Sequence, residues 1–170
     1  MGERGWRGCT PLTRMMIWMK DVPPAIKTFK PVLEESLEYF WEQFSSYALP
    51  MPLSPEPLGS PLLEVLTPLG PVWAFDRGLT PIGGESPPIL LHGQVERWEP
   101  EPMSPPLRYL GGGRYQVSGR VVERLGGAFF LLRIGGGAET LTLLLADLEP
   151  PPVGAEGTAW LAPPLMAFRP

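Results

Sequence analysis

Apolar residues near the amino end of the chain recur with the spacing of an α-helix. One apolar stripe contains Leu33, Leu37, Phe40, Phe44 and Tyr47. Trp41 widens this stripe, and Pro31 stands where the first turn of a helix tolerates proline. Pro50 ends the pattern, because the residue before a proline is disfavoured in the helical region. The pattern predicts an amphipathic helix within residues 21–49, centred on Pro31–Ser46.

Beyond Pro61 the apolar period changes to two residues. In the clearest case Tyr115, Val117, Gly119 and Val121 alternate with mostly polar residues. Glycine-rich turns separate this segment from two later ones. At least five strands are therefore expected past Pro61. The segments that carry the pattern are Leu62–Leu66, Val72–Phe75, Ile89–Trp98, Tyr115–Val122, Phe129–Ile134, Glu139–Leu148 and Thr158–Phe168.

Two of these segments share a Gly-x-Val core, at Gly93 and at Gly119. A glycine weakens a strand unless the strand bends there, and the coiled strands of small closed barrels need such bends. A Gly-x-Val strand, a hairpin and a third apolar strand resemble the first three strands of an OB-type barrel, over about residues 114–170. The expected fold is mostly β: a small OB-like β-barrel, or a sandwich, with one N-terminal amphipathic α-helix.

Proline and glycine, with 24 and 20 residues, divide the chain into segments. Residues 50–61 are dense in proline and predict a semi-rigid linker, and residues 62–170 are expected to form the β-barrel domain, compact together with the helix. Glu99–Pro106 is interpreted as a loop, with a proline-rich ligand for an aromatic groove as the alternative. Residues 1–20 are expected to be a flexible extension, with translation starting at Met1, Met15, Met16 or Met19. The absence of asparagine and the loop prolines indicate a thermophilic source.

Catalytic and metal-binding chemistry is poorly represented. Cys9 and His92 are the only cysteine and the only histidine, so neither an internal disulfide nor a typical zinc site can form. A nucleophilic triad needs a positioned base, and His92 has no candidate partner in the pattern. The sequence predicts a protein that is not an enzyme, binds no cofactor or metal, and is cytoplasmic. No apolar run approaches the roughly 20 residues that cross a bilayer, so no membrane partner is expected.

Positive charge gathers in one segment of an otherwise acidic chain. The chain has a formal net charge of −4, yet residues 107–135 contain five arginines and one glutamate, Glu123. Arginines beside aromatic residues on a curved sheet are typical of proteins that hold single-stranded nucleic acid. The predicted nucleic-acid-binding residues are Arg108, Arg114, Arg120, Arg124, Phe129 and Arg133. The alternative is an arginine-rich face that keeps a strand edge from aggregating.

The aromatic helix supports a second hypothesis. Phe40, Trp41 and Phe44 are the candidate partner-binding residues of an assembly or accessory subunit, which would dock another protein through the helix and the proline-rich segments. The competing interpretation is that the helix covers the protein's own sheet. A homo-oligomer also stays open. Strict alternation places Tyr115 on the face opposite to Arg120 and places Arg124 on the same face as Arg120, so Phe129 is the expected stacking residue.

Overall fold

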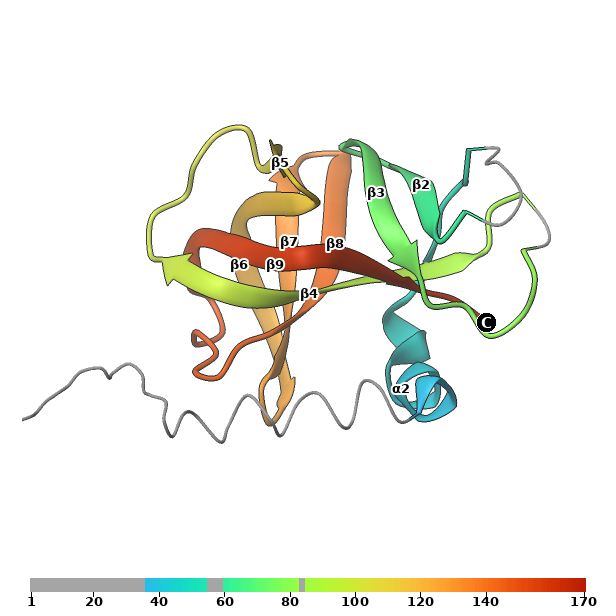
Figure 1. The fold of residues 1–170 in the computed structure, drawn as a ribbon. Coiled ribbons are helices and arrows are strands. Elements are labelled where there is room, and N and C mark those ends of the chain that lie inside the picture. The colour runs from blue at the N-terminus through green and yellow to red at the C-terminus, as the bar shows by residue number, and fades with distance from the viewer. Residues whose placement is uncertain (1–35, 55–59, 83–84) are drawn as a thin grey trace, which may run out of the picture. The chain divides into compact units, whose positions relative to one another are not determined.

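The computed structural model describes residues 36–54, 60–82 and 85–170 (Figure 1). The predicted N-terminal extension and the predicted start of the helix lie outside these residues. The chain divides into two compact units, Met1–Phe40 and Trp41–Pro170. All strands described below belong to the second unit.

The described part of the predicted helix is short. It consists of α2 (Leu37–Phe44) and a single 3-10 turn at Ser45–Tyr47. Before the helix, the Ser36 Oγ accepts a hydrogen bond of 3.0 Å from the backbone N–H of Tyr39, as an N-cap residue does. After the turn, Ala48 is extended (φ −72°, ψ 148°), so the helical conformation ends before Pro50 as predicted.

The described residues are mostly β, which confirms the predicted fold class at that level. Each of the seven predicted strands is present, while the hydrophobic pattern missed β1 and β5. The strands are β1 (Leu49–Pro50), β2 (Leu62–Thr67), β3 (Gly70–Asp76), β4 (Pro88–Glu99), β5 (Leu107–Gly111), β6 (Arg114–Gly126), β7 (Phe129–Gly136), β8 (Glu139–Ala146) and β9 (Glu156–Phe168).

Five strands pair in a closed circuit. In it β4 pairs with β8, β8 with β7, β7 with β6, β6 with β9, and β9 with β4. The β4–β8 pair is parallel and the other four are antiparallel. The remaining strands attach to this circuit: β5 pairs with the start of β6, β1 pairs with β4, and the antiparallel β2–β3 ribbon joins β9 only at Phe75 and Asp76 (Figure 1).

The inner face of the circuit is filled by the alternating apolar positions. Tyr115, Val117 and Val121 of β6 are buried there with Leu132 of β7. Gly119 continues the same alternation, but a Cβ at this position would overlap the carbonyl oxygen of the facing strand β7. The glycine therefore allows β6 and β7 to approach closely, and such a close approach is a known reason for a glycine inside a strand.

A second buried layer lies on the outer face of β4, β7 and β8. Leu131 pairs in register with Leu144, which in turn pairs with His92, and all three side chains are buried. Phe129 lies on the same side of β7, and its ring centroid is 5.0 Å from that of Phe44 at the end of α2. The end of the helix therefore packs on the protein's own sheet, as the competing interpretation expected.

The described part of the predicted linker is bound to the sheet. Met51 is buried, and its backbone N–H donates to the Pro87 carbonyl at 3.2 Å. The backbone N–H of Ser54 donates to the Glu64 carbonyl at 3.1 Å, and Leu53 forms an isolated bridge with Val65. Residues 49–54 thus use their free backbone groups to cover the edges of β4 and β2, which proline density alone does not reveal.

Candidate functional site

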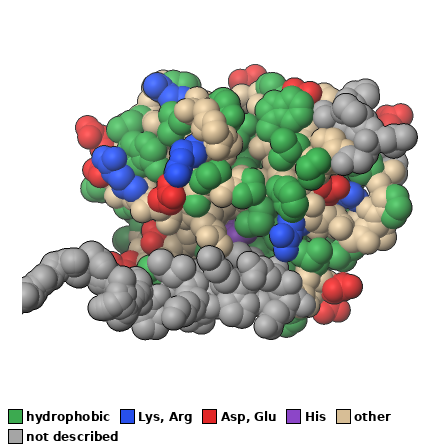
Figure 2. Space-filling view, viewed as in Figure 1, with side chains coloured by type: hydrophobic (Ala, Val, Ile, Leu, Met, Phe, Trp, Pro, Cys, Tyr) green, Lys and Arg blue, Asp and Glu red, His purple; other side chains and the backbone are tan. Residues whose placement is uncertain are grey.

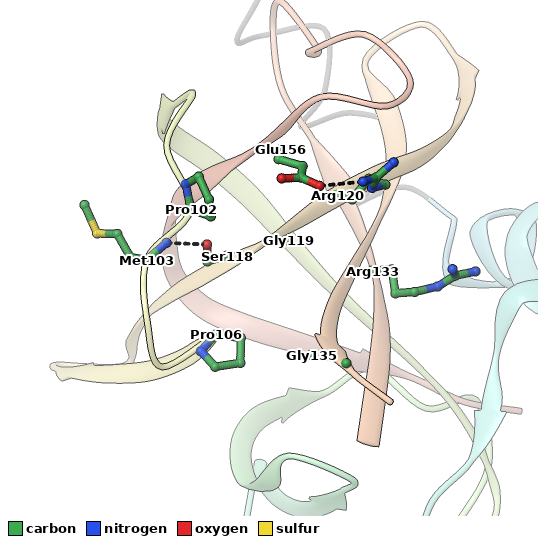
Figure 3. Close-up of a pocket in the computed structure, with 10 residues that line it drawn as sticks. Pro102, Met103, Pro106, Ser118, Gly119, Arg120, Arg133, Gly135 and Glu156 are labelled. Carbon is green, nitrogen blue, oxygen red and sulfur yellow. Dashed lines mark hydrogen bonds and ion pairs between the residues drawn. The ribbon is translucent and has the colours of Figure 1, made fainter. Parts of the chain in front are cut away.

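An open groove runs beside β6 on the arginine-bearing face of the sheet (Figure 3). Its volume is about 480 Å³. One wall is the loop that follows β4, with Pro102, Met103 and Pro106, and the floor is formed by Ser118 and Gly119 of β6. The polar part of the lining comes from Arg120, Arg133 and Glu156, and Gly135 and Gly136 complete it.

Hydrogen bonds hold the proline-rich loop in place as the wall of this groove. The backbone N–H of Met103 donates to the Ser118 Oγ at 2.7 Å, and the Ser118 N–H donates to the Pro106 carbonyl at 2.9 Å. The Thr158 hydroxyl donates to the Glu101 carbonyl at 2.7 Å. The loop interpretation of Glu99–Pro106 is therefore the one that fits, and the prolines form part of a fixed surface.

Two of the predicted arginines, Arg120 and Arg133, line this groove, and Arg108 lies on the same outer face of the sheet without lining it. Arg120 of β6 and Arg133 of β7 are direct cross-strand partners, and Arg108 of β5 pairs in register with Gln116. All three arginines are exposed. Arg120 forms an ion pair of 2.5 Å with Glu156, whereas no ion pair of Arg133 is found among the described residues. In Figure 3 the Arg133 side chain extends away from the Arg120–Glu156 pair.

The other two predicted arginines do not line the groove, although alternation along β6 places Arg114 on the same face as Arg120. Arg114 forms an ion pair with Glu96 of β4. Arg124 pairs in register with Phe130, a core residue, and therefore lies on the opposite face from Arg120. The expectation that Arg120 and Arg124 share a face is wrong, because a β-bulge between Val121 and Glu123 adds one residue to β6 and reverses the alternation after it.

Phe129 does not line the groove. Its ring is half-buried and contacts Phe44, and its centroid is 6.0 Å from the His92 ring. None of the residues that line the groove is aromatic. The apolar contacts that the groove offers are the side chains of Met103, Pro102 and Pro106, which the sequence analysis did not single out as site residues.

Tyr115 lies on the face opposite to Arg120, as strict alternation predicted for this part of β6. Its ring is buried, and its hydroxyl accepts a hydrogen bond of 2.8 Å from the backbone N–H of Trp73. Burial raises the pKa of the Tyr115 hydroxyl above its usual value. Tyr115 therefore links β6 to the β2–β3 ribbon and is not available to stack on a ligand.

The candidate partner-binding residues of the helix are largely enclosed. Phe40 is 1% exposed and Phe44 is 3% exposed, while Trp41 is half-buried. A hot-spot residue on a free surface has to be accessible before the partner arrives. Only Trp41 among the three has a substantial exposed fraction.

His92 is fully buried in the second layer. Its Nδ1 donates a hydrogen bond of 2.8 Å to the Leu144 carbonyl, which requires the proton on Nδ1 in the neutral ring. Desolvation by burial lowers the pKa of His92 to about 4. The histidine is therefore neutral at physiological pH and serves packing, away from the groove.

Positive charge is not continuous over the face shown in Figure 2. On this face the arginine side chains lie singly, and acidic side chains stand beside several of them. Arg97 illustrates this, since it pairs with Glu99 at 2.9 Å and lies over the Trp160 ring at 4.4 Å. The groove lining contains two arginines and one glutamate, so its charged side chains are positive on balance.

Neither a metal-binding cluster nor a membrane-spanning helix is found in the described parts of the chain. Across residues 36–54, 60–82 and 85–170, no group of three or more His, Cys, Asp or Glu side chains is placed to hold a metal ion. No helix in the described parts of the chain has the length and apolar character to cross a bilayer.

Comparisons with known proteins do not assign the groove. No protein-family model, curated protein or solved structure matches this chain, so the site has to be interpreted from its own geometry and charge.

Proposed function

We propose that this chain is a non-enzymatic binding module that holds single-stranded nucleic acid along the groove. The observation that carries the proposal is the cross-strand pair of Arg120 and Arg133 beside an open groove with an apolar wall. Like charges directly opposite each other on a sheet destabilise it. Glu156 already offsets Arg120, whereas no ion pair of Arg133 is found among the described residues, so Arg133 is the cation of this pair that an added anion can reach. A phosphate of a nucleic-acid chain supplies such an anion.

The ion pair of Arg120 does not prevent this use. The side chains of Arg120 and Glu156 are 59% and 49% exposed. An exposed ion pair contributes at most about 1 kcal/mol, so a phosphate can replace the carboxylate at little cost. Arg133 and Arg108 provide two further contacts, spaced along the same face. The acidic remainder of the chain opposes a polyanion, so the proposed binding is weak and strongly dependent on salt.

The apolar wall supports a single-stranded ligand. Met103 is 40% exposed and lies with two prolines along the groove, where the flat face of an unpaired base can contact it. Bases of a duplex have their faces covered by stacking and cannot use such a wall. Because the wall offers no hydrogen-bond pattern to base edges, the proposed binding has little sequence preference.

The OB-like barrel belongs to the same proposal. A closed circuit of five strands with a single parallel pair is compatible with a small Greek-key barrel. In this interpretation β6, β7 and β8 are the consecutive antiparallel strands, and β4, which precedes them in the chain, closes the circuit beside β8 and β9. The strand faces of such barrels commonly carry the oligonucleotide site.

Binding can be tested with labelled oligonucleotides of deoxythymidine and of uridine, by fluorescence anisotropy at low salt. Arg133→Ala is expected to weaken binding roughly five- to tenfold and to reduce the salt slope by about one. Arg124→Ala is the matched control, since this exposed arginine lies on the other face of the sheet. Failure of both oligonucleotides to bind at tens of micromolar protein, or equal losses in the two variants, contradicts the proposal.

The assembly-subunit hypothesis is less well supported in its original form. It assigned docking to Phe40, Trp41 and Phe44, of which two are buried, and to proline-rich segments, of which the one at 99–106 is fixed on β6. Docking through these elements stays a hypothesis. If neither oligonucleotide binds, it is the remaining one of the two.

A further inference from the structure

The β2–β3 ribbon presents an apolar face to the outside. Register places Leu62 opposite Phe75, Glu64 opposite Trp73, and Leu66 opposite Pro71, so these six residues share one face. The other face of the ribbon carries Leu63, Val65, Val72 and Ala74, which are buried in the core. Hydrophobic side chains gather over β3 in the view of Figure 2.

The six residues of the outer face are not part of the buried core. Trp73 is 45% exposed, Leu62 40% and Leu66 38%, and Pro71 between them is exposed as well. Scattered apolar residues on a surface need no explanation, but a contiguous group that includes a tryptophan is typical of an interaction site. Tryptophan is also among the residues that most often dominate the binding energy of protein interfaces.

One charged group stands in the middle of this face. Glu64 is half-buried, and no ion pair of its carboxylate is found among the described residues. Covering the face with a purely apolar surface would bury this carboxylate without a partner, which strongly disfavours such a complex. The cost disappears if the covering surface brings a cation to Glu64.

A second copy of this chain is a poor occupant. In a symmetric pairing of this face, two Glu64 carboxylates would enter one interface, where like charges repel. The face therefore fits a partner that differs from this chain and carries the opposite charge.

We propose that the outer face of β2–β3 docks a protein partner that presents apolar side chains around a Lys or Arg. In this arrangement the Trp73 ring is the main apolar contact, and Glu64 pairs with the partner's cation. Leu62, Leu66 and Pro71 exclude water around that pair, which strengthens it. This surface is separate from the groove, because none of its six residues lines the groove.

Photo-crosslinking of the full chain in an extract of source cells tests the docking surface. The photoreactive amino acid p-benzoylphenylalanine replaces Leu66, which leaves Trp73 and Glu64 in place. The same replacement at Val153, which is 58% exposed in the turn before β9, is the control. The expected result is an adduct to another protein from position 66 and none from position 153, with the linked peptide containing apolar residues and a Lys or Arg.

Capture alone is not sufficient, so the charge of Glu64 is varied in the Leu66-substituted chain. Glu64→Lys is expected to lower the adduct yield at least tenfold, and Glu64→Gln is expected to lower it by a smaller factor. Glu149→Lys, an exposed carboxylate after β8, makes the same change of net charge and is expected to leave the yield unchanged. Arg133→Ala should also leave it unchanged, which separates this site from the groove.

Three outcomes overturn the proposal: an adduct between two copies of this chain, no adduct at position 66, or a yield that Glu64→Lys does not reduce. Each variant is checked by its melting temperature. If Glu64→Lys lowers the melting temperature, the decision passes to Glu64→Gln, which keeps the size of the side chain. An unchanged yield in that variant then refutes the role of the carboxylate.

Discussion

Acidification from pH 7 to pH 5 is expected to destabilise the folded chain through His92. The folded pKa of this group is about 4, because burial disfavours the charged ring, whereas its ordinary value is 6.5. The unfolded chain therefore takes up a proton at a higher pH than the folded chain does. The stabilising contribution of the neutral histidine is fully present above the unfolded pKa of 6.5 and is lost as the pH falls toward 4.

The size of this effect follows from the two pKa values. Each unit of difference corresponds to about 1.4 kcal/mol, so the full loss approaches about 3 kcal/mol. Between pH 7 and pH 5 the expected loss is about 2 kcal/mol, since only the unfolded chain is substantially protonated at pH 5. His92 is the only histidine, so no other imidazole contributes. Burial also raises the pKa of Asp147, whose proton uptake favours the folded state and so acts in the opposite sense.

A matched variant isolates the contribution of His92. His92→Asn keeps a side-chain N–H that can donate to the Leu144 carbonyl, as Nδ1 does now, but it does not titrate. The free energy of unfolding is measured by urea denaturation at pH 7, 6 and 5 for both proteins. The wild-type advantage over His92→Asn should shrink by about 2 kcal/mol over this range. If the free energies of unfolding of the two proteins fall equally from pH 7 to pH 5, the interpretation that His92 is buried and neutral is refuted.

Three further changes test other parts of the structure. Gly119→Ala is expected to lower the free energy of unfolding by several kcal/mol, because the new Cβ overlaps the carbonyl oxygen of the facing strand. Thermal unfolding measures this loss, and an unchanged melting temperature argues against the close approach of β6 and β7. Arg169 is 5% exposed, and its guanidinium donates two hydrogen bonds to the Asp76 carboxylate, at 3.0 and 2.9 Å. Arg169→Met should therefore lower the free energy of unfolding, measured by urea denaturation, by about 3 kcal/mol, because it leaves the carboxylate without its partner. The double variant with Asp76→Asn should recover part of that loss. Glu156→Gln removes the carboxylate that pairs with Arg120, so it is expected to tighten oligonucleotide binding several-fold at low salt. Weaker binding in the anisotropy assay contradicts the proposed role of Arg120.

The local pattern of the sequence was sufficient to predict the elements. Helical spacing ended at Pro50 and alternation began past Pro61, and the structure has α2 and seven of its strands in the corresponding segments. This works because the side-chain periods of helices and strands are properties of neighbouring residues. The same pattern also placed Tyr115 opposite Arg120, where no irregularity lies between the two.

The missed strands show where local pattern stops being informative. β5 (Leu107–Gly111) alternates weakly because most of its side chains are exposed, and it is a strand only through its pairing with β6. Residues 49–54 are dense in proline, yet they cover the edge of β2, which follows soon after them, and the edge of β4, which lies much later in the sequence. Backbone pairing with another segment defines both: β5 pairs with β6 across a tight glycine turn, and residues 49–50 pair with β4, which lies much later in the chain. The residue pattern within either segment does not reveal that pairing.

The sequence by itself determined that this chain forms a mostly-β fold with an aromatic helix before it, and that arginines concentrate between residues 107 and 135. Which of those arginines face a common groove was decided by tertiary structure. One extra residue at the bulge after Val121 turns Arg124 to the other face, and Glu96 and Glu156, supplied by β4 and β9, pair with two of the rest. Bulges and cross-strand ion pairs depend on how the strands align with one another. Which charged side chains share a surface is therefore decided only when the strands pair.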